Sequence, residues 1–90
     1  MKGKQNIIGD QLQKLRLEKQ FSQEQLAAKC GVLGWDVSRS TLAKVEVQIR
    51  CVNDEELFIL AKALRVEMHD LFPSDFKRRF ATLYRIRRQR

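Results

Sequence analysis

Apolar residues recur at helical spacing in five blocks along this chain of 90 residues. The first block runs from about Ile7 to Gln20, and Ile8, Leu12 and Leu15 fall on one stripe of it. Apolar positions that repeat every three or four residues are typical of a helix with one buried face. The spacing therefore predicts a first amphipathic helix over this block.

The second block carries its own start and stop signals. Ser22 is suited to an N-cap, and Gln25 three residues later completes a capping box. Gly31 can supply the left-handed residue that ends the helix. The buried side of this predicted helix consists of Leu26, Ala27 and Cys30.

A third helix is predicted to begin at Ser38 and to cover about residues 38–47, burying Leu42, Val45 and Ile49. Asn53 and Glu56 form another capping box, which opens a fourth helix. The inner face of the fourth helix is predicted to use Leu57, Leu60, Ala61 and Leu64. In the short fifth block, "VEMHDLF", the residues predicted to close the core before Pro73 are Val66, Leu71 and Phe72.

The composition agrees with an all-α fold. One proline, four glycines and abundant Leu, Ala, Lys, Arg, Glu and Gln favour helix over strand. A chain of this length has room for one small core. We expect an N-terminal arm over residues 1–6, a compact five-helix domain over 7–73 and a basic C-terminal helix or tail over 74–90.

The positive charge is concentrated at one end. Residues 1–73 carry eleven Lys and Arg against ten Asp and Glu, whereas residues 74–90 carry seven against one. This imbalance indicates a polyanionic partner, either nucleic acid or an anionic membrane.

Other classes of function find no support in the sequence. Cys30 and Cys51 lack disulfide or zinc spacing, and no apolar run has the length of a signal peptide or a membrane span. His69, the single histidine, has no catalytic constellation around it and is expected on the surface. We expect a cytoplasmic, non-enzymatic protein without a metal or other cofactor.

Three segments taken in order resemble a known family. They are "LRLEKQFSQEQLAAKCGV", "SRSTLAKVE" and "ELFILAKALRVEMHDLF". In this order and spacing they resemble the XRE-type, phage-repressor-like (Cro/repressor) helix-turn-helix DNA-binding proteins, and the likeness covers roughly Ile7 to Phe72. The chain departs from the family in five extra residues, about "LGWDV", between the second and third helices. It also has Gln48 where the family commonly has a glycine.

The resemblance implies that the third helix enters the DNA major groove. If its apolar residues face inward, the opposite face presents Arg39, Ser40, Thr41 and Lys44. Arg and Lys can donate to guanine, and hydroxyl groups can bond to several bases. These four residues are therefore the predicted base contacts, although an ordinary solvated face would have the same polarity.

The resemblance also implies contacts away from the bases. Gln23 and Ser38, next to helix N-termini, are predicted to contact phosphates, because helix N-termini attract anions. Arg16 and Glu46 match a pair that joins the first helix to the third in the family.

Two segments are not explained by the resemblance. In the extra loop, Leu33, Trp35 and Val37 alternate with Gly34 and Asp36, which favours packing on the domain over contact with DNA. The tail could form an amphipathic helix over residues 75–88, or remain frayed. Its apolar stripe would be Phe76, Phe80, Leu83 and Tyr84, and its predicted phosphate contacts are Arg78, Arg79 and Arg85.

The function that the sequence favours is a sequence-specific transcriptional regulator, a repressor that acts as a homodimer on double-stranded DNA. The alternative is an antitoxin-like module whose main contact is a protein partner, a toxin or another regulator, with secondary DNA binding. A third interpretation, in which the tail binds an anionic membrane, is not preferred.

Overall fold

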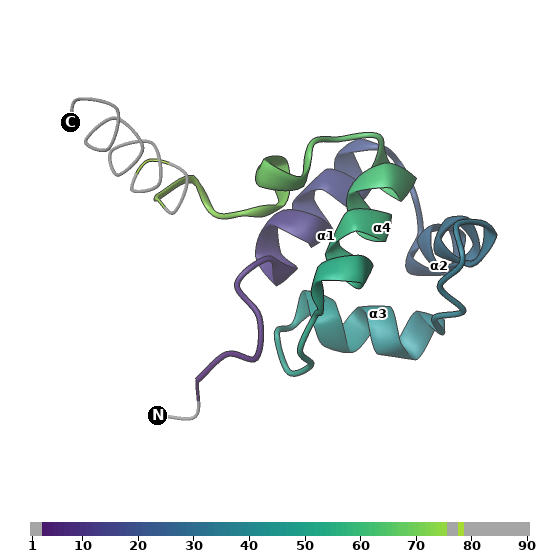
Figure 1. Ribbon diagram of the computed structural model, residues 1–90, viewed down its shortest axis with the longest axis horizontal. Helices are drawn as coiled ribbons and strands as arrows, with labels where there is room; N and C mark the ends of the chain where they lie inside the picture. Colours follow the sequence, from purple (N-terminus) through teal and green to yellow (C-terminus); the bar gives the residue numbers. More distant parts are fainter. Residues whose placement is uncertain (1–2, 76–77, 79–90) are drawn as a thin grey trace.

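The computed structural model describes residues 3–75 and 78, and within them every regular element is helical. The elements are α1 Gly9–Glu18, α2 Gln23–Val32, α3 Arg39–Glu46, α4 Asp54–Leu64 and the 3-10 helix η1 Met68–Leu71 (Figure 1). The all-α class is confirmed. The short fifth helix predicted for the last block is a four-residue 3-10 helix, so the fold has four α-helices and one 3-10 helix in the described residues.

Helix α1 is shorter than predicted at both ends. Ile8 and Leu12 are buried, and Leu15 packs against the core from a partly buried position. Asn6, which precedes the helix, accepts hydrogen bonds through Oδ1 from the amides of Ile8 (3.0 Å) and Gly9 (2.8 Å). This asparagine therefore satisfies donors that a helix start leaves free.

Helix α2 begins as predicted and ends differently. The Ser22 hydroxyl accepts from the Gln25 amide and the Gln25 side chain accepts from the Ser22 amide, so the predicted capping box is confirmed. The prediction that Gly31 ends the helix is wrong, because α2 continues to Val32 and the left-handed residue is Gly34, with φ of 106°. Burial raises the pKa of the Cys30 thiol to about 11, which keeps this core residue protonated.

Helix α3 has the predicted cap and most of the predicted inner face. The Ser38 hydroxyl accepts from the Thr41 amide at 3.1 Å, and Leu42 and Val45 are fully buried. The predicted burial of Ile49 is wrong, since this side chain is 63% exposed. Helical spacing no longer applies there, because α3 ends at Glu46 and the chain turns at Gln48 with φ of 68°.

Helix α4 confirms the second predicted capping box, in which Asn53 and Glu56 exchange side-chain and amide hydrogen bonds. The helix ends at Leu64, and its C-cap Arg65 adopts a left-handed conformation with φ of 58°. Of its predicted inner face, Leu60, Ala61 and Leu64 are buried and Leu57 is partly buried. The core is closed beyond α4 by buried Leu71 with partly buried Val66 and Phe72.

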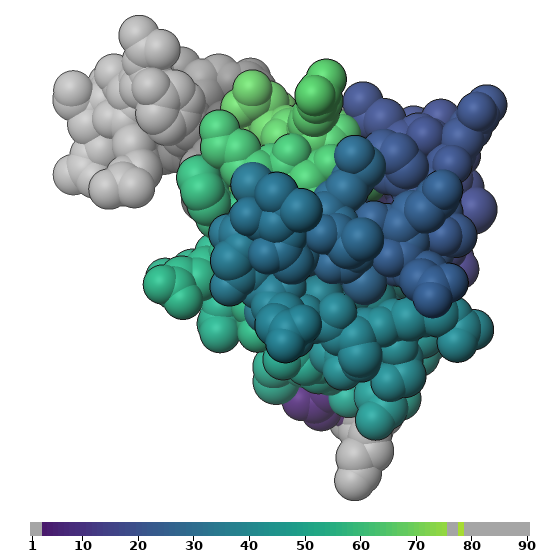
Figure 2. All heavy atoms as spheres, turned by 90° about the vertical axis from the view of Figure 1, so that its right-hand side faces the viewer, coloured from purple at the N-terminus to yellow at the C-terminus, as the bar shows by residue number. Residues whose placement is uncertain are grey.

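Helix α3 lies at one edge of the domain (Figure 1). Helix α2 packs against α3 and α4, α1 packs against α3 and η1, and η1 also packs against α4. Figure 2 shows the surface of α2 directly above that of α3. Helix α3 is thus held from within by α1 and α2, and its other side faces outward (Figure 1). No helix in the described residues has the length and apolarity needed to cross a membrane.

The start of the chain is tied to the turn that follows α3. The Gln5 amide donates to the Gln48 carbonyl at 2.9 Å, and the Gln48 side chain donates back to the Asn6 carbonyl at 3.1 Å. Asn6 Nδ2 in turn donates to the carbonyls of Val45 (3.0 Å) and Arg50 (2.8 Å). This network fixes residues 5 and 6 beside the end of α3.

Two glycines offer a matched test of the packing between α1 and α3. A Cβ added at Gly9 would lie 2.5 Å from the Val45 carbonyl oxygen and 2.7 Å from that of Glu46, whereas one added at Gly31 would meet nothing within 4 Å. We expect Gly9→Ala to lower the free energy of unfolding by at least ~1–3 kcal/mol, because the two helices must move apart. Gly31→Ala should raise it by ~0.4–1 kcal/mol, because it removes freedom from the unfolded chain.

Urea unfolding followed by circular dichroism measures both changes. Equal effects of the two substitutions would contradict the close approach of α1 and α3. A destabilising Gly31→Ala would restore the prediction that this glycine ends α2.

Candidate nucleic-acid interface

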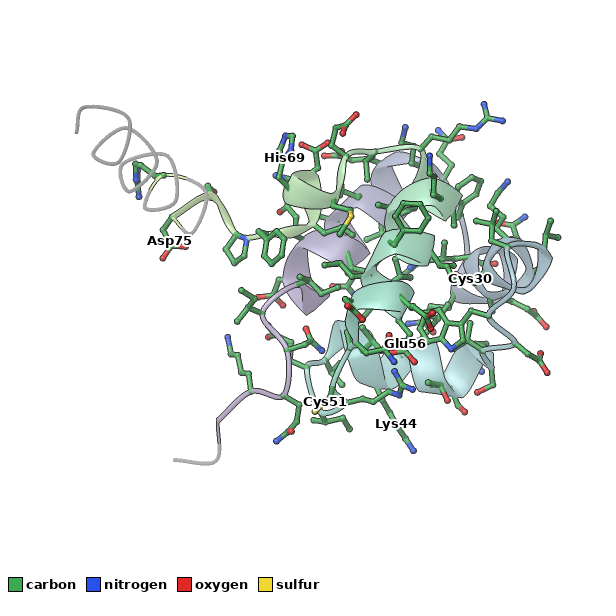
Figure 3. The ribbon with its side chains drawn as sticks, viewed as in Figure 1. Cys30, Lys44, Cys51, Glu56, His69 and Asp75 are labelled. Carbon is green, nitrogen blue, oxygen red and sulfur yellow. The ribbon has the colours of Figure 1, made fainter. Side chains whose placement is uncertain are left out.

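The outer face of α3 consists of Arg39, Ser40 and Lys44, which are all exposed. Because Leu42 and Val45 are buried on the inner side of the same eight-residue helix, the outer face cannot turn inward without emptying the core. Figure 3 shows Lys44 extending away from the body of the domain. The result is a short polar surface with two cations, of a kind that can donate hydrogen bonds to base edges and phosphates.

The hydroxyl groups at the start of α3 are less available than the sequence suggested. The hydroxyl oxygens of Ser38 and Ser40 lie 3.2 Å apart, within hydrogen-bond distance. Thr41 is half-buried, and its hydroxyl accepts a hydrogen bond from the Ser38 hydroxyl at 3.0 Å. Ser38 is exposed, but its oxygen also caps the Thr41 amide. Thr41 therefore lies at the margin of the outer face, and Ser38 would have to share its hydroxyl with any phosphate.

Arg16 and Glu46 are brought together in the interior, where their exposed fractions are 7% and 3%. Arg16 Nε donates to Glu46 Oε2 at 2.6 Å and Nη2 donates to Oε1 at 3.1 Å. Arg16 Nη1 also donates to the Phe21 carbonyl at 2.8 Å. The pair joins the end of α1 to the end of α3, and a third hydrogen bond attaches it to the connection that leads into α2.

Gln23 joins the same network from the first turn of α2. Its Nε2 donates to Glu46 Oε1 at 3.0 Å, and the side chain is half-buried. A primary amide nitrogen carries two hydrogens, so one N–H is used by Glu46 and the second can still meet a phosphate. The contact holds the predicted phosphate ligand at a fixed place relative to α3.

The loop between α2 and α3 packs on the domain through two of its three apolar side chains. Val37 is buried and Trp35 is partly buried against the core, whereas Leu33 is 45% exposed at the C-cap of α2. The structure therefore favours the packing interpretation of Trp35. The Leu33 part of that prediction is wrong, because Leu33 caps α2 and does not enter the loop's inner face.

The remaining predicted site residues lie elsewhere. Arg78 is exposed, whereas Arg79 and Arg85 lie outside the described residues, as does the predicted apolar stripe of the tail. His69 is on η1 with a side chain that is 68% exposed.

Sequence reasoning missed several residues that position α3. Asn6 could have been found, because an asparagine just before a helix commonly bonds to the following amides. The Gln48 and Arg50 contacts join residues far apart in the chain, and no local pattern marks them. Two exposed apolar residues, Val47 and Ile49, also lie in the turn that follows α3.

Comparison with known proteins agrees with this geometry. The sequence profile of the helix-turn-helix family matches residues 12–71. Among solved structures, the chain is similar to the restriction-modification controller protein C.AhdI from Aeromonas hydrophila, with 37% sequence identity and a TM-score of 0.65. The match covers 72% of this chain and 91% of that chain. No curated protein matches the chain.

The buried ion pair can be tested by truncating one partner. Glu46→Ala leaves the Arg16 guanidinium buried without its carboxylate, so we expect a loss of ~3–5 kcal/mol in the free energy of unfolding. Glu18→Ala removes the same charge from an exposed position on α1 and should change stability by less than ~0.5 kcal/mol. Urea titrations of both variants give the comparison, and a loss below about 1 kcal/mol for Glu46→Ala would contradict burial of the pair.

Proposed function

The chain belongs to the helix-turn-helix family of XRE type, whose members are DNA-binding transcription regulators, and from this premise we propose that it is a dimeric repressor. In this proposal α3 enters the major groove of a pseudo-palindromic site. Each subunit reads one half-site, as is usual for dimeric helix-turn-helix proteins.

The observation that carries the proposal is the outer face of α3. Its two cations and one hydroxyl residue are exposed, while the inner face is held by buried leucine and valine and by the Arg16–Glu46 pair. A rigidly held polar helix face keeps its side chains in a constant register, which direct readout of base edges requires. We assign base contacts to Arg39, Ser40 and Lys44, and a marginal contact to Thr41.

Repression is the simplest outcome of such binding. A dimer that covers a promoter blocks access to it without any further contact, so the DNA interface alone is sufficient. A helix as short as α3 reaches few base pairs, and a second subunit doubles the sequence that is read. Gln23 and Ser38 would position each subunit through the phosphates, as would Arg78, Arg79 and Arg85 of the tail.

A second candidate is the antitoxin-like module, in which a protein partner is the main ligand. It is favoured by Val32 and Leu33, which are 87% and 45% exposed at the end of α2. Apolar side chains that lie together in water often mark a contact with another protein. A polypeptide that copurifies in stoichiometric amount and abolishes duplex binding would support this candidate over the repressor.

Selection of bound duplexes from a random library tests the proposal directly. We expect an enriched sequence with two related half-sites about 10 base pairs apart, one helical turn of DNA. On that duplex, Arg39→Ala and Lys44→Ala should each relax the preference at one base position by ~1–3 kcal/mol. Gln23→Ala should instead weaken selected and random duplexes about equally.

A random pool that stays random after selection would refute sequence-specific binding. Equal losses on selected and random duplexes for both Arg39→Ala and Lys44→Ala would show that α3 is not in the groove as proposed.

The tail is tested separately through salt dependence. Each phosphate contact adds about 0.9 to the slope of log affinity against log salt, so three arginine contacts predict that removal of residues 75–90 lowers its magnitude by ~2.7. The base preference should stay the same. A deletion that turns a dimer into a monomer in sedimentation without changing the slope would show that the tail is an oligomer interface.

A further inference from the structure

The connection between α2 and α3 is too long to set the angle of α3 by itself. Six residues, 33–38, separate the two helices, whereas two-helix DNA readers usually have three or four. Each added residue brings two more soft backbone dihedrals. Contacts between distant parts of the chain must therefore hold α3 in place.

Trp35 provides such a contact on the entry side of α3. Its amide donates to the Cys30 carbonyl in α2 at 2.9 Å, and its own carbonyl accepts from the Val37 amide at 2.8 Å. Val37, two residues further on, is buried in the core. The backbone of Trp35 is therefore fixed on both sides, and its partly buried ring packs against the core in the connection before α3.

Arg50 provides the matching contact on the exit side. Its guanidinium carbon lies 5.6 Å from the centroid of the Trp35 ring, within the range of a cation–π contact. Its Nη1 and Nη2 also bind Glu56 in a bidentate pair, at 2.9 and 3.1 Å. Hydrogen bonding to Arg50 lowers the pKa of the Glu56 carboxyl from its ordinary value.

The partner of Arg50 is itself fixed. Glu56 Oε1 accepts from the Asn53 amide as part of the cap of α4, and the Arg50 carbonyl accepts from Asn6. Arg50 thus links three places: the connection before α3, the turn after α3 and the first turn of α4. Residues 35 and 50 flank α3 in the chain and contact each other.

We propose that Trp35, Arg50 and Glu56 form a clamp that sets the orientation of α3, and that they are positioning residues for sequence discrimination that do not contact DNA. This inference rests on the proposed function. The charge of Arg50 faces Glu56 and the indole. Loss of the clamp should therefore reduce the preference for the selected duplex and leave electrostatic attraction to DNA unchanged.

Two variants loosen the clamp without removing charge. Arg50→Lys keeps the cation but lacks the planar fork needed for a bidentate pair, and Trp35→Leu keeps apolar bulk but lacks the ring. Trp35→Phe restores an aromatic face and serves as the rescue. Phe58→Leu is the matched control, since it removes an equivalent contact, Lys62 Nζ at 5.5 Å from the Phe58 ring, between two residues of α4 that are not part of the clamp.

The readout is the ratio of affinities for the selected and random duplexes over a salt series, at a temperature where every variant is folded. Arg50→Lys and Trp35→Leu should each lower this ratio roughly three- to tenfold, with the salt slope on random duplex unchanged. Trp35→Phe should recover most of the ratio, and Phe58→Leu should leave it unchanged. Because Trp35 is the single tryptophan, its emission should also stay constant when duplex is added to the native chain.

Other outcomes would overturn the clamp. A slope that falls by about 0.9 for Arg50→Ala would make Arg50 a phosphate contact, as would equal losses on both duplexes. Quenching of Trp35 by duplex would place the loop at the DNA.

If the native chain prefers no sequence, the proposed function fails. A double-mutant cycle of Trp35 and Arg50 in urea unfolding then decides whether the clamp exists. Zero coupling would refute it, whereas a coupling of about two- to fivefold in the folding equilibrium constant would support it.

Discussion

The buried pair of Arg16 and Glu46 is the contact on which the arrangement of α1, α2 and α3 depends. Leucine and valine side chains can pack in several related ways, since apolar attraction has no preferred direction. A buried guanidinium and carboxylate can pack in only one way, because each loses solvation free energy unless it finds its hydrogen-bond partners. Here one pair takes partners from the end of α1, the connection before α2, the first turn of α2 and the end of α3. A shift of any of these helices would break at least one of these bonds.

Around this pair, the local signals in the sequence were reliable. The capping boxes of Ser22 with Gln25 and Asn53 with Glu56 were predictable because both partners lie within one turn of helix. The inner faces of α3 and α4 followed from spacing alone as long as the helix continued. Gly31 and Ile49 show where this reasoning stops, because the helix boundary decides which residues share a face and tertiary contacts decide the boundary.

The contacts that position α3 could not be predicted, with one exception. The Arg16 and Glu46 pair was inferred from the family resemblance, whereas Asn6 with Gln48 and Trp35 with Arg50 join segments that no periodicity relates. The exposed side chains of α3 were predictable from the same spacing as its core. Sequence reasoning therefore found which residues face outward but gave little information on what holds them there.

The turn after α3 limits which substitutions this sequence can accept. Gln48 adopts a left-handed conformation that costs a non-glycine residue about 1–2 kcal/mol, and its side chain offsets this by bonding to the Asn6 carbonyl. A glycine at position 48 would relax the backbone and remove the side-chain bond to the Asn6 carbonyl in one step, whereas the bonds from Gln5 and Asn6 to backbone carbonyls do not depend on that side chain. Gly9 faces the same turn and admits no Cβ, because two carbonyl oxygens of α3 lie against it. Because positions 6, 9 and 48 are in contact, we expect the effect of a substitution at one of them on stability to depend on the residues at the other two.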